Sequence, residues 1–114
     1  EYRDMINLMA RVHLVMSDSG GLQEECPVFK KPLVLMRETT ERPEGVESGI
    51  TALCGTEEDA IFKCTCKLLT DSNEYDRMAN SKNPFGDGKA SERIVDVLAY
   101  YFGFKSEPPD EFIP

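Results

Sequence analysis

The chain has 114 residues, enough for one small domain, and its hydrophobic content of 40% and charged content of 30% are typical of globular proteins. The formal net charge of −8 argues against a nucleic-acid partner, and it requires any anion site to work through local backbone groups and arginines. No apolar run is long enough to cross a membrane and no secretory signal is visible at the start, so we expect a cytoplasmic protein without a membrane partner.

The first part of the chain predicts a helix followed by a buried strand. Apolar residues at helical spacing indicate a helix over 2–9, which begins without a clear cap and suggests a chain cut from something longer. The nearly unbroken apolar run from Val12 to Met16 is typical of a parallel strand covered on both faces. His13 lies inside this run, where we expect a structural or partly buried side chain rather than a catalytic one.

The stretch S-D-S-G-G-L-Q-E-E at 17–25 joins this strand to a helix-like run from Leu22 to Phe29. A tight glycine turn that opens a helix presents backbone N–H groups without intrahelical partners, and the helix dipole favours an anion there. Gly20 and Gly21 allow another group to approach the backbone closely, and Ser19 adds a hydroxyl, so the stretch predicts a phosphate-binding site. The alternative is an ordinary N-cap and turn that bind nothing.

A second strand and a polar loop follow. Pro27 should kink or shorten the helix after the glycines, and Pro32 to Met36 is the predicted strand. The loop Arg37 to Gly45 leaves the carboxyl end of that strand, where open α/β sheets bind ligands. Arg37 and Arg42 are candidates to clamp an oxyanion, and the alternative is a solvated loop with surface ion pairs.

A third strand is predicted over 51–54. Thr56 and the three acidic residues after it resemble a capping box, which should start a helix that runs to about residue 70. Leu68 and Leu69 are expected on the side of this helix that faces the core.

The last third of the chain predicts two more helices and an irregular tail. The helices cover 73–80 and 89–102, and a glycine-bearing turn at 83–89 precedes the second, with Asp87 as its N-cap. The tail 105–114 is rich in proline and acidic residues, a composition that disfavours regular structure.

The four cysteines do not form a metal-binding pattern. They include no CxxC pair, and Cys64 and Cys66 point to different faces of a helix. With a single histidine in the chain, the ligand spacing disfavours a zinc site, so we expect no metal and reduced cysteines.

Strands that alternate with helices predict a Rossmann-like α/β fold, a parallel sheet with right-handed crossovers. Only three strands are evident, which is half of a doubly wound domain. Three strands leave edges that another part of a protein would normally cover.

Three motifs in order carry a resemblance to a known family: S-D-S-G-G-L-Q-E-E at 17–25, R-E-T-T-E-R-P-E-G at 37–45 and N-P-F-G-D-G-K-A-S-E-R-I at 83–94. The chain resembles the C-terminal part of the non-hydrolysing UDP-N-acetylglucosamine 2-epimerases over nearly all of residues 2–102. The resemblance implies the GT-B architecture, in which two Rossmann-like domains face a cleft. It also implies interconversion of UDP-N-acetylglucosamine and UDP-N-acetylmannosamine by elimination and re-addition of UDP, with no metal or nicotinamide cofactor.

The resemblance further implies which residues hold UDP. Ser19 and Gly20 match the positions that bind the diphosphate, and Gly21 is expected to add an N–H. Glu25 matches the glutamate that holds the ribose hydroxyls. Arg42 matches the arginine that contacts the phosphate side of the nucleotide.

The family's proton-transfer carboxylates lie in its N-terminal domain, and this chain has no counterpart, so we expect no catalytic residue here. Glu24 is expected to point away from the site of its neighbour Glu25. Residues 1–104 are thus predicted to be the UDP-binding half-domain of a longer enzyme, with 105–114 as a tail. Its expected partners are a UDP-sugar, the N-terminal domain and a second copy in a homodimer. The alternatives are a non-catalytic nucleotide-sugar-binding module and a fragment of a GT-B glycosyltransferase.

Overall fold

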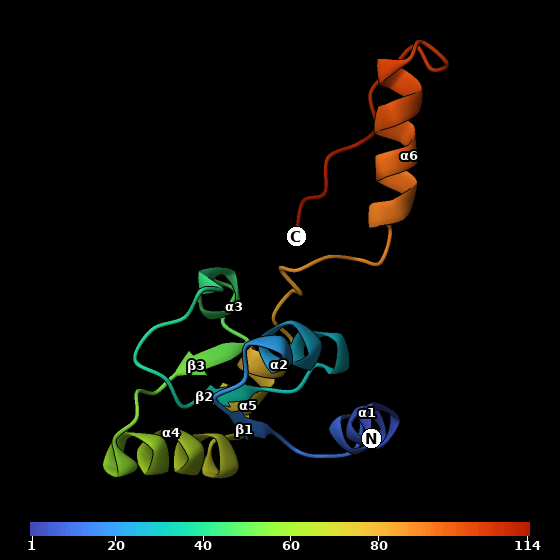
Figure 1. Ribbon diagram of the computed structural model, residues 1–114. Helices are drawn as coiled ribbons and strands as arrows, with labels where there is room; N and C mark the ends of the chain where they lie inside the picture. Colours follow the sequence, from blue (N-terminus) through green and yellow to red (C-terminus); the bar gives the residue numbers. More distant parts are fainter. The chain divides into compact units, whose positions relative to one another are not determined.

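The computed structural model describes residues 1–114, which form two compact units, Glu1–Pro84 and Phe85–Pro114. The first unit contains three short strands and most of the helices (Figure 1). In chain order its elements are α1 (Tyr2–Met9), β1 (Val15–Ser17), α2 (Gly20–Glu25), the 3-10 helix η1 (Cys26–Phe29), β2 (Leu33–Leu35), α3 (Pro43–Glu47), β3 (Thr51–Leu53), α4 (Glu58–Thr70) and α5 (Ser72–Ala79).

The three strands form a parallel sheet in the order β1-β2-β3, which confirms the predicted arrangement. Val15 pairs with Leu33, and Leu33 pairs with Thr51 on its other side. The central strand β2 is fully buried, with an exposed fraction of 0% for Leu33, Val34 and Leu35. A strand that is apolar at every position is typical of a parallel sheet covered on both faces.

The core lies on the two faces of β2, because successive residues of a strand point to opposite sides. Residues of α1 and of the segment after α2 pack on one face, and residues of α4 and α5 pack on the other. The first cluster consists of Met9, Cys26, Leu33 and Leu35, and the second of Val34, Leu68 and Met78. This packing fixes the carboxyl ends of the strands and so positions the loops that leave them.

The first strand is shorter and less covered than predicted. It begins at Val15 rather than Val12, and it pairs with β2 only, so it is an edge strand of this sheet. Met16 is 44% exposed, and the predicted coverage on both faces is wrong at this residue. His13 precedes the strand on the surface, where its ring stacks on Tyr75 at 4.0 Å between centroids and its carbonyl accepts a hydrogen bond from Tyr75 Oη at 2.8 Å. The histidine is therefore structural, as predicted, but it lies outside the strand.

Two prolines shape the segments around β2. The helix opened by the glycines ends as α2 at Glu25, and Pro27 lies in the 3-10 helix that follows, which confirms the predicted shortening. The predicted loop over 37–45 is wrong in its last part, because Pro43 begins α3. Proline suits the first turn of a helix, where its missing N–H needs no partner.

Thr56 does not begin a capping box. The N-cap of α4 is Glu57, and its side chain makes no cap hydrogen bond. Thr56 instead donates to Glu38 Oε1, from its hydroxyl at 2.6 Å and from its backbone N–H at 2.9 Å, which lowers the pKa of the Glu38 carboxyl. These bonds join the loop after β2 to the segment before α4. Within α4, Leu68 is buried as predicted, whereas Leu69 is 60% exposed and is not a core residue.

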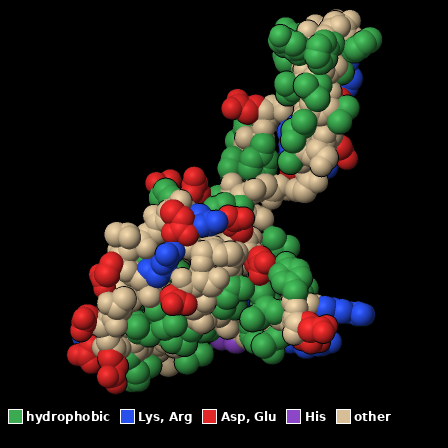
Figure 2. All heavy atoms as spheres, in the orientation of Figure 1, with side chains coloured by type: hydrophobic (Ala, Val, Ile, Leu, Met, Phe, Trp, Pro, Cys, Tyr) green, Lys and Arg blue, Asp and Glu red, His purple; other side chains and the backbone are tan.

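The second unit contains α6 (Ala90–Tyr101), close to the predicted bounds, and the tail 105–114 has no helix or strand. The N-cap of α6 is Lys89, so the prediction that Asp87 caps this helix is wrong. Asp87 accepts the Lys89 N–H at 3.0 Å and two guanidinium N–H groups of Arg93 at 2.7 and 2.8 Å, and the arginine holds its pKa well below the usual range. Hydrophobic side chains gather on the surface of α6 (Figure 2). None of the helices combines the length and the apolar character that crossing a membrane requires.

We expect Glu74 of α5 to titrate far below an ordinary glutamate. Arg77 Nε donates to its carboxylate at 2.8 Å and Lys67 Nζ at 3.1 Å, and together they lower its pKa to about 2. Because the folded-state pKa lies below the unfolded value of 4.5, the group stabilises the fold above that pH, and the stabilisation is lost as the pH falls towards 2. NMR titration of the Glu74 carboxyl measures the midpoint, and a value near 4.5 contradicts the prediction. In Glu74→Gln, thermal unfolding should lose this part of its pH dependence.

Candidate functional site

The segments that leave the carboxyl ends of the three strands surround one open cleft of about 590 Å³. Asp18 lines it after β1, residues 36–41 line it after β2, and Thr56 lines it after β3. Ligands of open α/β sheets bind at this edge of the sheet. The lining side chains are mostly polar or charged, which suits a ligand with hydroxyl groups.

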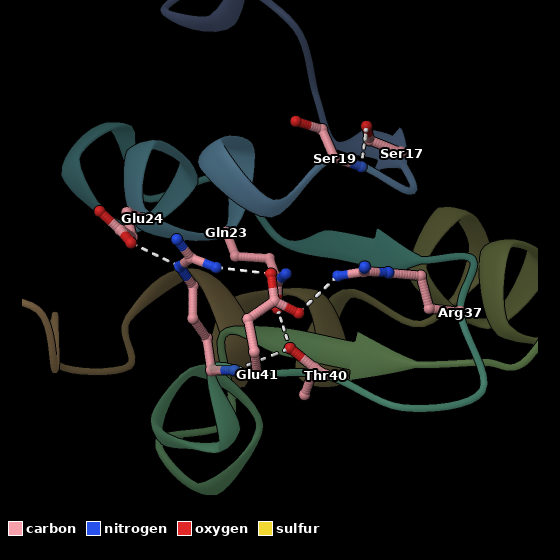
Figure 3. Close-up of polar contacts among 8 residues, drawn as sticks. Ser17, Ser19, Gln23, Glu24, Arg37, Thr40 and Glu41 are labelled. Carbon is pink, nitrogen blue, oxygen red and sulfur yellow. Dashed lines mark hydrogen bonds and ion pairs between the residues drawn. The ribbon is translucent and has the colours of Figure 1, made fainter.

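The glycine turn between β1 and α2 has the geometry of a helix start. Ser19 is the N-cap residue, with extended backbone (φ −73°, ψ 133°), and the helix begins at Gly20. The Ser19 hydroxyl makes no cap hydrogen bond, so the first N–H groups of α2 have no capping partner from this side chain. The Ser19 N–H donates to Ser17 Oγ at 3.0 Å (Figure 3). Ser19 therefore occupies the N-cap position, as the alternative of an ordinary N-cap predicts, but its side chain does not make the capping hydrogen bond.

Gly20 lies directly against the loop after β2. A Cβ atom at this position would lie 2.8 Å from Glu41 Oε1 and 3.3 Å from Arg42 Nη1. The first distance is shorter than real Cβ contacts, so any other residue would displace the Glu41 side chain. The glycine turn and the arginine-bearing loop, which are separate motifs in the sequence, therefore meet at Gly20 and Arg42.

Arg42 lies in a cluster of charged side chains, of which Glu24, Glu41 and Arg37 are labelled in Figure 3. Its Nε donates to Glu24 and its Nη1 to Glu41 Oε1 at 2.6 Å, and the other oxygen of Glu41 accepts from Arg37 Nη1 at 2.7 Å. The hydrogen bond to Glu24 raises the pKa of Arg42, and the backbone N–H of Glu41 together with the two arginines lowers the pKa of Glu41. The four side chains are between 28% and 51% exposed, so their ion pairs are weak. Such pairs are what the alternative of a solvated loop with surface ion pairs predicts. The same exposure leaves Arg42 within reach of an anionic ligand.

Glu25 and Gly21 lie apart from this cluster. Glu25 Oε1 accepts a hydrogen bond from Tyr2 Oη at 3.0 Å, which raises the pKa of the tyrosine. Nothing lies within 4 Å of the Cβ position of Gly21. Glu24 and Glu25 bind different partners, as expected of neighbours on a helix, but Glu24 is the one that contacts Arg42, whereas Glu25 binds Tyr2. The nucleotide contacts of Glu25 and Gly21 stay predictions.

Sequence reasoning missed the parts played by Gln23, Glu24 and Thr40. A signal existed for the first two, because positions 20, 23 and 24 share one face of a helix through their i, i+3 and i, i+4 spacing. Thr40 donates to Gln23 Oε1 at 2.5 Å and accepts from the Arg42 N–H at 3.0 Å. Its role depends on the path of an irregular loop, for which the sequence holds no periodic signal.

A parallel α/β sheet with a glycine turn and a charged loop at its carboxyl edge defines a Rossmann-like domain, a class that binds ligands at this edge. The family model for UDP-N-acetylglucosamine 2-epimerase matches residues 1–99, and the chain belongs to this family. It is 48% identical over 112 residues to the UDP-N-acetylglucosamine 2-epimerase of Bacillus subtilis, covering 98% of this chain and 30% of that protein. The family membership removes the alternative of a glycosyltransferase fragment.

Solved structures share this fold. A crystal structure of UDP-N-acetylglucosamine 2-epimerase matches with a TM-score of 0.90 and 47% identity, covering 100% of this chain and 31% of that one. The S. aureus MnaA–UDP co-structure matches with a TM-score of 0.86 and 41% identity, covering 96% and 30%. The fold prediction, a Rossmann-like part of a GT-B architecture, is confirmed. The chain spans less than a third of the length of these proteins.

Proposed function

We propose that this chain is the UDP-binding portion of an isomerase that interconverts UDP-N-acetylglucosamine and UDP-N-acetylmannosamine by elimination and re-addition of UDP. The observation that carries the proposal is the approach of Arg42 to Gly20 at the carboxyl edge of the sheet, in a chain of the epimerase family. Support comes from the S. aureus relative, whose structure is a complex with UDP.

In this proposal the diphosphate binds at the glycine turn. The Ser19 hydroxyl and the backbone N–H groups of Gly20 and Gly21 donate to its oxygens, and Arg42 supplies positive charge. Negative charge grows on UDP as its bond to the sugar breaks. Donors and a cation that are fixed in advance stabilise that charge and lower the barrier to elimination.

Glu25 is proposed to hold the ribose hydroxyls, since a carboxylate accepts hydrogen bonds from two neighbouring hydroxyls. Its Oε1 is bonded to Tyr2 Oη in this structure, so binding the ribose requires the carboxylate to share or exchange that partner. The proton-transfer groups are proposed to belong to an N-terminal domain, and the complete enzyme is proposed to be a cytoplasmic homodimer. No metal or organic cofactor is part of the proposal.

Replacing Glu25 by Gln tests the nucleotide assignment. The amide keeps the shape and still accepts the Tyr2 hydrogen bond, so the thermal unfolding temperature should stay nearly unchanged. The loss of charge weakens the bonds to the two hydroxyls, so UDP affinity should fall by roughly five- to tenfold. Calorimetric titration of UDP into the natural full-length protein measures this effect.

Glu24→Gln is the matched control, because it makes the same chemical change one residue away. The amide oxygen can still accept the Arg42 hydrogen bond, and removing a carboxylate beside the arginine does not disfavour an anion, so affinity should not fall. If Glu25→Gln instead lowers the unfolding temperature without changing UDP affinity, Glu25 is a structural partner of Tyr2. The diphosphate assignment would then rest on Ser19, the glycines and Arg42.

A further inference from the structure

Gln23 is a buried polar side chain whose presence the stability of the fold does not explain. It is the only polar side chain of α2 with an exposed fraction of 0%. Only half of its amide is bonded: Oε1 accepts from Thr40 Oγ1 at 2.5 Å, whereas Nε2 is buried without a hydrogen-bond partner. Burying an unpartnered N–H group is unfavourable, and an apolar side chain of similar length would avoid that cost.

A short chain of hydrogen bonds leads from Gln23 to Arg42. The Thr40 hydroxyl has one hydrogen to donate, and it gives this hydrogen to Gln23 Oε1 (Figure 3). The hydroxyl oxygen in turn accepts the backbone N–H of Arg42 at 3.0 Å. Gln23 therefore orients the Thr40 hydroxyl so that a lone pair of the hydroxyl oxygen faces the backbone N–H of Arg42, the N-cap residue of α3.

The other contacts of Arg42 are less permanent. Its partners Glu24 and Glu41 are 50% and 51% exposed, and exposed ion pairs rearrange readily. A bound anion competes with both carboxylates for the same guanidinium group. The backbone bond to Thr40 does not involve the guanidinium, so an anion bound to the guanidinium does not compete for it.

We propose that Gln23 is a positioning residue for Arg42. Acting through Thr40, it fixes the Arg42 backbone to the buried side of α2, and thereby sets where the guanidinium lies relative to the turn at Gly20. Gln23 itself does not touch the nucleotide. This inference rests on the proposed function, in which Arg42 binds the diphosphate of UDP.

Two variants of the natural full-length protein remove this link, Gln23→Met at one end and Thr40→Val in the middle. Each should weaken UDP binding in calorimetry by about fivefold, the loss expected when a charged group is displaced from its productive position. Thr40→Ser keeps the hydroxyl and should bind UDP like the unaltered protein. The unfolding temperature of Gln23→Met should stay the same or rise, since the variant removes the unpartnered Nε2.

The decisive measurement is a double-mutant cycle with Arg42→Ala. If Gln23 acts through Arg42, Gln23→Met should cost no further affinity once the arginine is gone. An equal loss in both backgrounds, or no loss in the unaltered background, overturns the proposal. Should Gln23→Met fail to fold, Thr40→Val answers the same question, because Thr40 is only partly buried. If Arg42→Ala alone leaves UDP affinity unchanged, the proposed function of Arg42 has failed and the positioning role fails with it.

Discussion

The isolated chain 1–114 should not convert UDP-N-acetylglucosamine into its mannosamine epimer, whereas the natural full-length protein should. Epimerisation requires a proton to be removed and returned, and a general base needs a pKa near the working pH. Glu38 and Glu41 of the cleft have the opposite property, because Thr56 lowers the pKa of Glu38 and the surroundings of Glu41 lower its pKa. Glu41 is also paired with Arg37 and Arg42, so it is a poor proton acceptor.

Chromatographic separation of the two UDP-sugars after incubation measures this difference. Circular dichroism and a UDP titration on the same sample show whether the isolated chain is folded and able to bind. Robust turnover by the pure chain would overturn the division of labour proposed between this chain and an N-terminal domain. UDP binding without turnover by the full-length protein would favour the alternative of a non-catalytic nucleotide-sugar-binding module.

The parts of the fold that follow from the sequence are those that one local pattern decides. Leu33, Val34 and Leu35 form an uninterrupted apolar run, and the central strand lies there with no exposed surface. Pro27 shortens α2 because proline has no N–H for the helical hydrogen bond and its ring clashes with the preceding turn. Thr56 shows the limit of local patterns, since the hydroxyl that resembles a cap binds Glu38, 18 residues earlier in the chain. Local spacing carries no information about such a competing partner.

The site follows the same rule. The motifs identify Gly20 and Arg42. Both motifs follow the carboxyl end of a parallel strand, so the two segments are expected at the same edge of the sheet, where they meet. The rule does not say which side chains meet there, so it does not indicate that Glu24 rather than Glu25 contacts Arg42. Glu24 lies four residues after Gly20 on the face that meets the loop, and its carboxylate accepts a hydrogen bond from Arg42 Nε. Glu25 faces α1 instead, where Tyr2 binds it.

Replacing Arg42 by Ala should weaken UDP binding by roughly ten- to a hundredfold, the cost of losing charge-assisted hydrogen bonds to a phosphate. The Arg42 side chain is 28% exposed and its partners are surface carboxylates, so the unfolding temperature should change little. The loss of affinity should be larger than removal of the positive charge alone would cause, because Glu24 loses its arginine partner and Glu41 keeps only Arg37. Arg42→Lys should recover only part of the affinity, since an ammonium group lacks the planar fork that binds phosphate oxygens in pairs.

Arg77→Ala is the control for this prediction. Arg77 is also an exposed, ion-paired arginine, but it belongs to α5 and pairs with Glu74 rather than with Glu24 or Glu41. Removing it changes the net charge by the same amount as Arg42→Ala. A loss of affinity shared by both variants would therefore reflect only the effect of the protein's net charge on an anionic ligand. A loss confined to Arg42→Ala places the arginine at the nucleotide. Unchanged UDP affinity and turnover in Arg42→Ala would leave it as a residue of a solvated loop whose ion pairs with Glu24 and Glu41 serve no ligand.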